Sequence, residues 1–283
     1  MAWFTSKRSG TFPGSVLIVA LDGWVNAGKA GTVAAETLVG GGEVVAEFDP
    51  DLLFDFRQNR PIVQFDEGVM TGVEWPSMTL RHRRVGELDL LALIGTEPNW
   101  NWHRFAAQVV RLSRDLGVVR HISLGGIPWA TPHTRPVTIV ATASSREALP
   151  EGHSHPEGTL RVPASAVSVV EKAVADAGIT TIGLWARVPQ YVGAEYAAAA
   201  LALVEAVSGV VGVDFDVTEL VEAAASQRTH LDAIVAARPD IRSVVEKLEA
   251  MVDEIGLTTG EELAAEIERF LRNQDGDEPG PAR

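Results

Sequence analysis

The chain has 283 residues and a formal net charge of −14, with 46% hydrophobic and 22% charged residues. This length and composition are typical of one large α/β domain, alone or with an appendage. The absence of cysteine excludes disulfides, thiol nucleophiles and cysteine-based metal sites. The acidic charge argues against nucleic-acid binding, and no apolar run approaches the ~18 residues of a membrane helix. We therefore expect a cytoplasmic protein that binds neither nucleic acid nor membrane.

Apolar runs typical of strands alternate with helical patterns through the first three quarters of the chain. Residues 15–22 (SVLIVALD) predict a buried strand, and residues 30–39 predict a helix that ends at three glycines. Residues 77–95 predict a hairpin that turns at Gly86. Further strands are predicted in EVVAEFD, VVRHISLGG, PVTIVATA and TTIGLWARVP, with helices between them. This alternation predicts a mostly parallel sheet that is covered by helices on both faces.

From Asp214 onward the pattern predicts helices only. Residues 214–283 hold 17 acidic and 7 basic residues, a net charge of −10, whereas the first 213 residues carry the remaining −4. Helix starts are marked by two capping-box pairs and one proline: Asp216 and Glu219, Pro239, and Thr258 and Glu261. We predict an α/β body over 1–213, a helical extension over 214–273 and a disordered tail over 274–283.

The loop after the first buried strand resembles a phosphate-binding P-loop. Gly23 and Gly28-Lys29 have the spacing G-x-x-x-x-G-K, but Ala30 stands where Ser or Thr would bind Mg²⁺. A nucleotide site therefore lacks its metal-binding hydroxyl. The alternative is a tight strand-to-helix turn in which Asn26 caps the helix, and we favour that interpretation.

Two other loops follow predicted strands and carry candidate ligand-binding side chains. The stretch GTEPNWNWH places Glu97 and Trp100 after a strand, and SLGGIPWATPHTRP places a glycine pair and two cationic side chains after the next. Ligands of α/β proteins bind at this edge of the sheet, so we expect these groups to converge there. Each of these residues also has a purely structural interpretation, as a cap, a turn or a loop contact. The pocket candidates are Asp22, Gly23, Asn26, Glu97, Trp100, Gly125, Gly126, His133 and Arg135.

The sequence declares no catalytic set. It contains no G-x-S-x-G nucleophile elbow, so we assign no catalytic residue. His153 and His155 have metal-ligand spacing, but they lie among Gly, Pro and Glu with no clear third ligand, which favours an exposed loop. We therefore expect neither a metal nor a cofactor, and we lean against an enzyme.

Taken together, LDGWVNAGKAG, GTEPNWNW and SLGGIPWATPHTRP, with DLLFDFRQNRPIV at 51–63, resemble the proteasome assembly chaperone 2 family. The chain is similar to the bacterial branch with a helical C-terminal extension. The resemblance implies a phosphorylase/hydrolase-like fold, a three-layer α/β/α sandwich with a mixed sheet. It also implies a role in protein assembly, since the eukaryotic members help to build the α-ring of the proteasome.

The leading functional hypothesis is thus a protein-interaction module of the assembly-chaperone kind. Proteasome-binding members often end in a hydrophobic residue, a tyrosine and one more residue, but this sequence ends in Pro281-Ala282-Arg283, which argues against proteasome docking. The alternative is a small-molecule-binding protein or a hydrolase- or ligase-type enzyme that uses the strand-end loops. A discriminating observation is a polar pocket formed by residues 22–28, 96–102 and 125–135.

We also expect a homo-oligomer. The alanine-rich helix predicted over 193–208 and tryptophans in loops offer apolar contact surface, with a dimer or a trimer as the expected assembly. The acidic extension is expected to point away from such a contact, because like charges repel across a symmetric interface.

Overall fold

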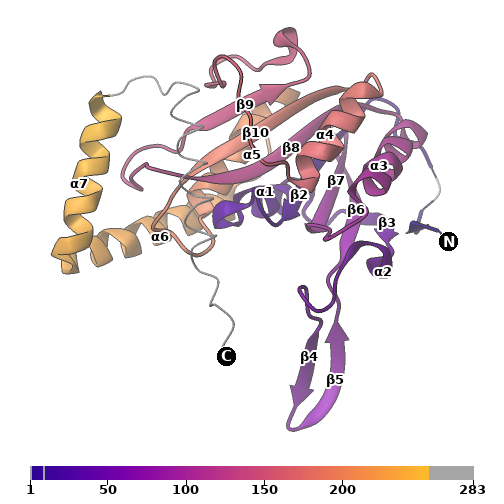
Figure 1. The fold of residues 1–283 in the computed structure, drawn as a ribbon, viewed down its shortest axis with the longest axis horizontal. Helices are drawn as coiled ribbons and strands as arrows, with labels where there is room; N and C mark the ends of the chain where they lie inside the picture. The colour runs from indigo at the N-terminus through magenta and orange to yellow at the C-terminus, as the bar shows by residue number, and fades with distance from the viewer. Residues whose placement is uncertain (1, 9, 255–283) are drawn as a thin grey trace, which may run out of the picture.

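The computed structural model describes residues 2–8 and 10–254, and its centre is one eight-stranded sheet (Figure 1). In spatial order the strands are β1, β3, β6, β7, β2, β8, β10 and β9. Their bounds are β1 Phe4–Ser6, β2 Ser15–Asp22, β3 Glu43–Phe48, β6 Met78–Val85, β7 Leu88–Thr96, β8 Val118–Trp129, β9 Ile139–Ala143 and β10 Thr180–Pro189.

The sheet is mixed, with a parallel centre and antiparallel margins. The four neighbouring strands β7, β2, β8 and β10 run parallel. Strands β2 and β7 are largely apolar because both faces of the sheet are covered. Strands β6, β3 and β1 extend the sheet on one side and β9 closes the other, all by antiparallel pairing. The predicted hairpin over 77–95 is confirmed as β6–β7.

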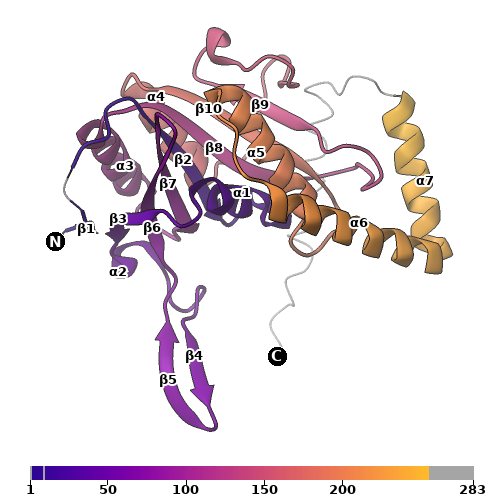
Figure 2. The ribbon, with the colours of Figure 1, turned by 180° about the vertical axis from the view of Figure 1, so that it is seen from behind.

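Helices cover both faces of the sheet and complete the predicted three-layer sandwich. Helices α3 (Trp102–Leu116) and α4 (Ala166–Asp176) pack on one face and lie in front of the sheet in Figure 1. Helices α1 (Ala30–Val39) and α5 (Ala197–Val211) cover the other face, which Figure 2 shows from behind. The short helix α2 (Pro50–Leu53) follows β3, and 3-10 turns span Ala27–Lys29 and Arg146–Ala148.

The alanine-rich helix α5 is a core element, which corrects its expected role as an association surface. Ala199, Ala200, Leu203 and Val204 are fully buried against the sheet and helix α1. The small side chains let the helix approach its neighbours closely, so the alanine content reflects packing within one chain.

A second, two-stranded sheet projects from the body. Strands β4 (Ile62–Asp66) and β5 (Val69–Glu74) form an antiparallel hairpin that extends far below the main sheet in Figures 1 and 2. We call residues 62–74 the arm. The sequence analysis assigned no hairpin to this segment.

After the body, helix α6 (Thr218–Ala237) packs on α5 and leads to helix α7 (Pro239–Glu254), at the end of the molecule remote from the arm. Pro239 starts α7 as predicted. Asp216 precedes α6 and accepts hydrogen bonds from the amide and hydroxyl of Thr218. It does not form the predicted capping box with Glu219, because the helix begins at Thr218, two residues after Asp216. The second capping box and third helix lie outside the described residues, and the division at residue 213 stays a prediction.

Candidate functional site

The P-loop-like turn is closed by the side chain of Asn26. The Asn26 Oδ1 atom accepts hydrogen bonds from the amides of Gly31, at 3.0 Å, and Thr32, at 3.2 Å, in the first turn of α1. Its Nδ2 atom donates to Asp22 at 3.0 Å and to the Thr32 hydroxyl at 2.9 Å. These are the amides that a P-loop would turn toward a phosphate. Asn26 therefore acts as the predicted helix cap and fills that position itself.

Glu97 occupies the next candidate position and ties three segments together. Its Oε2 accepts from the amide of Trp24 at 2.9 Å, and its Oε1 accepts from the amide of Ala166 at 2.7 Å. The Glu97 amide in turn donates to the carbonyl of Asp22 at 2.9 Å. Ala166 is the first residue of α4, so this carboxylate lies at the positive end of that helix. Glu97 thus binds groups of its own chain with both oxygens.

Three glycines allow these segments to approach one another. A Cβ atom on Gly23 would lie 2.3 Å from Oε2 of Glu97. Cβ atoms on Gly125 and Gly126 would lie 2.3 Å and 2.2 Å from the carbonyl oxygens of Val25 and Ala27. The Gly126 amide also donates to Val25 at 2.8 Å. We call Asp22, Gly23, Asn26, Glu97, Gly125 and Gly126 the strand-end cluster. Atoms of this chain occupy the space beside each of its three glycines.

Trp100 belongs to a different neighbourhood, at the base of the arm. Its side chain is 45% exposed, and the adjacent asparagines hold the segment that leads into the arm. Asn99 accepts from the amide of Asp55 at 2.7 Å, and Asn101 donates to the carbonyl of Leu52 at 2.8 Å. Asn101 takes the N-cap position of α3, with a positive φ of 62° and no side-chain capping bond.

His133 and Arg135 bind the helical extension rather than the strand-end cluster. The Arg135 guanidinium donates to both Asp253 carboxylate oxygens, at 3.0 and 2.8 Å, and reaches Glu249 at 3.4 Å. Thr134 donates to the same Glu249 carboxylate. His133 contacts Asp232 through Nε2 at 3.1 Å. We call this set of contacts between loop 133–135 and helices α6 and α7 the clasp.

The protonation state of His133 follows from its partners. Burial lowers the pKa of His133 against the opposing hydrogen bond to Asp232, which favours the neutral imidazole. The Tyr191 hydroxyl lies 2.6 Å from both the His133 amide and Nδ1. We assign the tautomer in which Nε2–H donates to Asp232 and Nδ1 accepts from Tyr191, because each hydrogen then has an acceptor.

The candidate residues therefore fall into a strand-end cluster, a clasp and the base of the arm, not into one pocket edge. The sequence analysis missed the clasp partners Tyr191, Asp232, Glu249 and Asp253. It also missed the arm, although its alternation around Asp66-Glu67-Gly68 carried a hairpin signal. Glu67 and Gly68 both have positive φ, at 47° and 84°, as a primed hairpin turn requires.

The arm carries a concentration of exposed apolar side chains. Strand pairing places Val63 opposite Val73 and Phe65 opposite Met70. Val63 and Phe65 are two positions apart and share one face. Their partners Val73 and Met70 face the same way across a register shift in β5, so these four side chains form one apolar face. The large exposed apolar residues at the arm and its base are Ile62, Val63, Phe65, Val69, Met70, Val73 and Trp75. Phe65, for example, is 63% exposed.

Within residues 2–8 and 10–254, no helix is long and apolar enough to cross a membrane. The same part of the chain contains no group of three or more His, Asp or Glu side chains placed to hold a metal ion. His155 is exposed and His153 is half-buried, with its pKa lowered by burial. The expected absence of a metal and of a cofactor stays a prediction.

Comparisons with known proteins agree with the fold and assign a family. No curated protein matches the chain. A structure of the Mycobacterium tuberculosis protein Rv2714, of unknown function, is 33% identical, with 96% of each chain covered and a TM-score of 0.87. The M. tuberculosis proteasome-assembly chaperone homologue Rv2125 is 28% identical over 81% of this chain and 99% of its own, with a TM-score of 0.73.

A PAC2 family protein from Streptomyces avermitilis is 30% identical over 83% of this chain and 99% of its own, with a TM-score of 0.71. The sequence profile of the PAC2 family matches residues 20–235, which span β2 to α6 and include the arm. Helix α7, which supplies half of the clasp, follows that match. On this profile match the chain belongs to the PAC2 family.

Proposed function

We propose that the protein is a cytoplasmic interaction module of the assembly-chaperone kind that works as a homo-oligomer, a dimer or a trimer. The observation that carries this proposal is the exposed apolar face of the arm. Exposed apolar patches of this kind mark protein contact sites. The similarity to a proteasome-assembly chaperone homologue at 28% identity supports a role in protein assembly.

The occupant we assign to the arm is a second copy of this chain. A lone two-stranded hairpin is marginally stable in water, so an arm with an apolar face needs a partner that is always present. A second copy of the same chain meets that need, because it is present wherever the chain is synthesised. The apolar composition of this face also resembles permanent interfaces more than transient ones.

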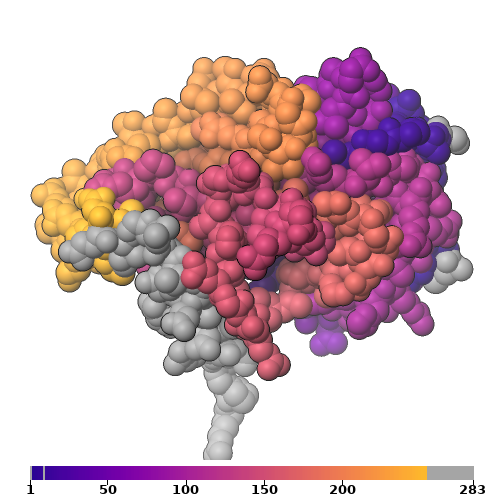
Figure 3. Space-filling view, turned by 90° about the horizontal axis from the view of Figure 1, so that it is seen from above, coloured from indigo at the N-terminus to yellow at the C-terminus, as the bar shows by residue number. Residues whose placement is uncertain are grey.

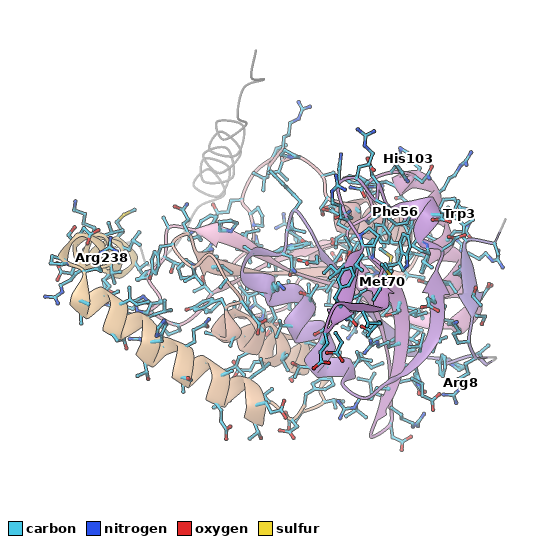
Figure 4. The ribbon with its side chains drawn as sticks, turned by 90° about the horizontal axis from the view of Figure 1, so that it is seen from below. Trp3, Arg8, Phe56, Met70, His103 and Arg238 are labelled. Atoms are coloured by element: carbon cyan, nitrogen blue, oxygen red, sulfur yellow. The ribbon has the colours of Figure 1, made fainter. Side chains whose placement is uncertain are left out.

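The position of the acidic extension is compatible with such an assembly. Figure 4 shows Arg238, at the corner between α6 and α7, at one end of the molecule and Met70, in the arm, well away from it. Copies that meet through the arm therefore need not bring their acidic helices α6 and α7 into contact.

A small-molecule enzyme that uses the strand-end cluster is the weaker alternative. Asn26 and Glu97 are the polar groups best placed to bind a ligand there, but they bind backbone amides of the chain itself. We propose that these residues are a scaffold that fixes the strand-end loops and the N-terminus of α4.

The test is the oligomeric mass of the full chain and of a variant carrying Phe65→Ser and Met70→Ser, measured by light scattering. The proposal expects an oligomer for the wild type and a folded monomer for the variant. The matched control is Val119→Ser on the body, whose side chain is 57% exposed, and it should leave the oligomer intact. An arm variant that keeps the wild-type mass would show that the arm is not the interface.

A further inference from the structure

A cavity of about 340 Å³ lies between α4, strands β9 and β10, and the segment 144–163. Figure 3 shows this segment on the surface beside α4. The cavity is distinct from the arm and from the clasp. Its size is within the range of small-molecule sites, which are mostly apolar with a few placed polar groups.

The floor of the cavity is the indole of Trp185, laid across two glycines. Gly183 precedes Trp185 on β10, and Gly125 is its register partner on β8. Cβ atoms on Gly183 and Gly125 would each lie 2.8 Å from indole atoms, so the ring occupies the space that side chains would fill. The indole Nε1 donates to the Thr142 hydroxyl at 3.0 Å, which fixes the ring. The aromatic face is thus a prepared apolar surface, and Val140 and Leu160 line the cavity beside it.

A buried polar chain ends at the cavity wall. His121 Nε2 lies 2.9 Å from Ser123 Oγ, and both residues are fully buried on β8. Burial lowers the pKa of His121 to about 3, so its imidazole is neutral. Glu171 of α4 lines the cavity, and the Ser123 side chain lowers its pKa against the larger, opposite effect of burial. We assign Nε2–H as donor to Ser123 and the Ser123 hydroxyl as donor to the Glu171 carboxylate, so the chain ends on an acceptor.

Strand β10 contributes a second polar group to the lining. The Thr181 side chain on β10 is buried, its residue is 1% exposed, and its hydroxyl has no hydrogen-bond partner among the described residues. A buried hydroxyl without a partner costs on the order of 1–3 kcal/mol, so a ligand that binds it gains that energy. Burial also raises the pKa of Glu171, as expected for a carboxylate that faces an apolar space without a cation.

Among the described residues, the cationic side chain that lines the cavity is already paired. Lys172 lines the cavity, but its ammonium binds both carboxylate oxygens of Asp176, at 2.5 and 2.6 Å. The Lys172 ammonium is therefore not free to neutralise the Glu171 carboxylate.

We propose that this cavity binds a small primary amine with an aromatic or branched aliphatic body. The ammonium group donates to the Glu171 carboxylate and the Thr181 hydroxyl, and the apolar body packs on the Trp185 ring. A ligand carboxylate in place of the amine is repelled by Glu171, and a neutral group leaves the carboxylate without a counter-charge.

The test uses 2-phenylethylamine as the probe on the full chain, with 2-phenylethanol and 3-phenylpropionate as neutral and anionic analogues of similar size. Binding is measured by calorimetry and by tryptophan fluorescence. The amine should bind at least tenfold more tightly than the alcohol, and the acid should not bind. Equal binding of amine and alcohol, or no binding of the amine at millimolar concentration, overturns the proposal without any variant.

Variants then locate the site. Glu171→Gln should weaken amine binding about tenfold and leave binding of the alcohol unchanged, and Thr181→Val should weaken it about threefold. Trp185→Phe should abolish the fluorescence change while calorimetry still detects binding. The matched control is Glu205→Gln, a carboxylate that lines two other cavities, and it should have no effect. Amine binding that is unchanged by Glu171→Gln would place the amine elsewhere and contradict the assignment.

Discussion

The Glu97 carboxylate accepts a hydrogen bond from the Ala166 amide at 2.7 Å, across 69 residues of sequence. This contact joins the end of strand β7 to the first residue of α4, and the second oxygen of the same carboxylate holds the loop after β2. The sequence pattern indicates Glu97 as a ligand-binding candidate, but in the structure its carboxylate holds three segments of the chain together.

The clamp predicts a stability effect for Glu97→Ala. Removing the carboxylate leaves the amides of Trp24 and Ala166 without their acceptor, which should lower the free energy of unfolding by about 2 kcal/mol. Urea unfolding measures the change. Glu36→Ala, an exposed acid on α1, is the control and should stay within about 0.5 kcal/mol of the wild type. Equal stability of both variants would leave Glu97 free for a ligand and contradict the scaffold assignment.

The P-loop-like turn should not bind nucleotide. The side chain of Asn26 already accepts the hydrogen bonds of the amides at the start of α1. ATP with Mg²⁺ should therefore not raise the melting temperature of the wild type, and Lys29→Ala should not change that melting temperature. Thermal unfolding with and without ATP and Mg²⁺ checks both statements. A Mg²⁺-dependent rise that is lost in Lys29→Ala would restore the nucleotide hypothesis.

The clasp predicts a local effect for Arg135→Ala. Loss of the paired contact with Asp253 should release α7 and speed amide hydrogen exchange in 239–254, with little change in the global free energy of unfolding. Arg84→Ala is the control, since it breaks an ion pair with Asp89 inside the β6–β7 hairpin. Unchanged exchange in α7 after Arg135→Ala would mean that α7 is held without the clasp.

Buried His121 predicts acid sensitivity. Its pKa is about 3 in the folded chain and near 6.5 when unfolded, so the unfolded state binds the extra proton between these values. Stability from this residue is complete above pH 6.5 and falls by about 1.4 kcal/mol per pH unit below it. Urea unfolding at pH 7, 6 and 5 should therefore show a steeper loss for the wild type than for His121→Gln. Parallel losses in the two proteins would show that another group controls the acid response.

The sequence was sufficient to predict the layers of the fold, because burial imposes visible patterns. Strand β2 is continuous and apolar since parallel strands are covered on both faces, and Gly31 marks a close approach of α1 to Leu124. The alanine content of α5 is compatible both with close packing on a sheet, which the structure shows, and with an association surface, because composition alone does not distinguish the two.

The contact partners of the candidate residues could not be predicted from the sequence. Arg135 and Asp253 are 118 residues apart, and no local spacing indicates that they meet. The arm was missed although Pro61 and Pro76 bound it and Glu67-Gly68 marks its turn. Its alternation was readable, but its exposure depends on the placement of 52–59 at its base, which is a tertiary property.

The most direct test of the central claim is sedimentation equilibrium of the full chain from about 1 to 100 micromolar. The account predicts the mass of a dimer or a trimer over this range, which reverts to that of a monomer when Phe65 and Met70 are replaced by serine. A wild-type chain that is strictly monomeric at every concentration would contradict it, because the apolar face of the arm would then have no second copy to cover it.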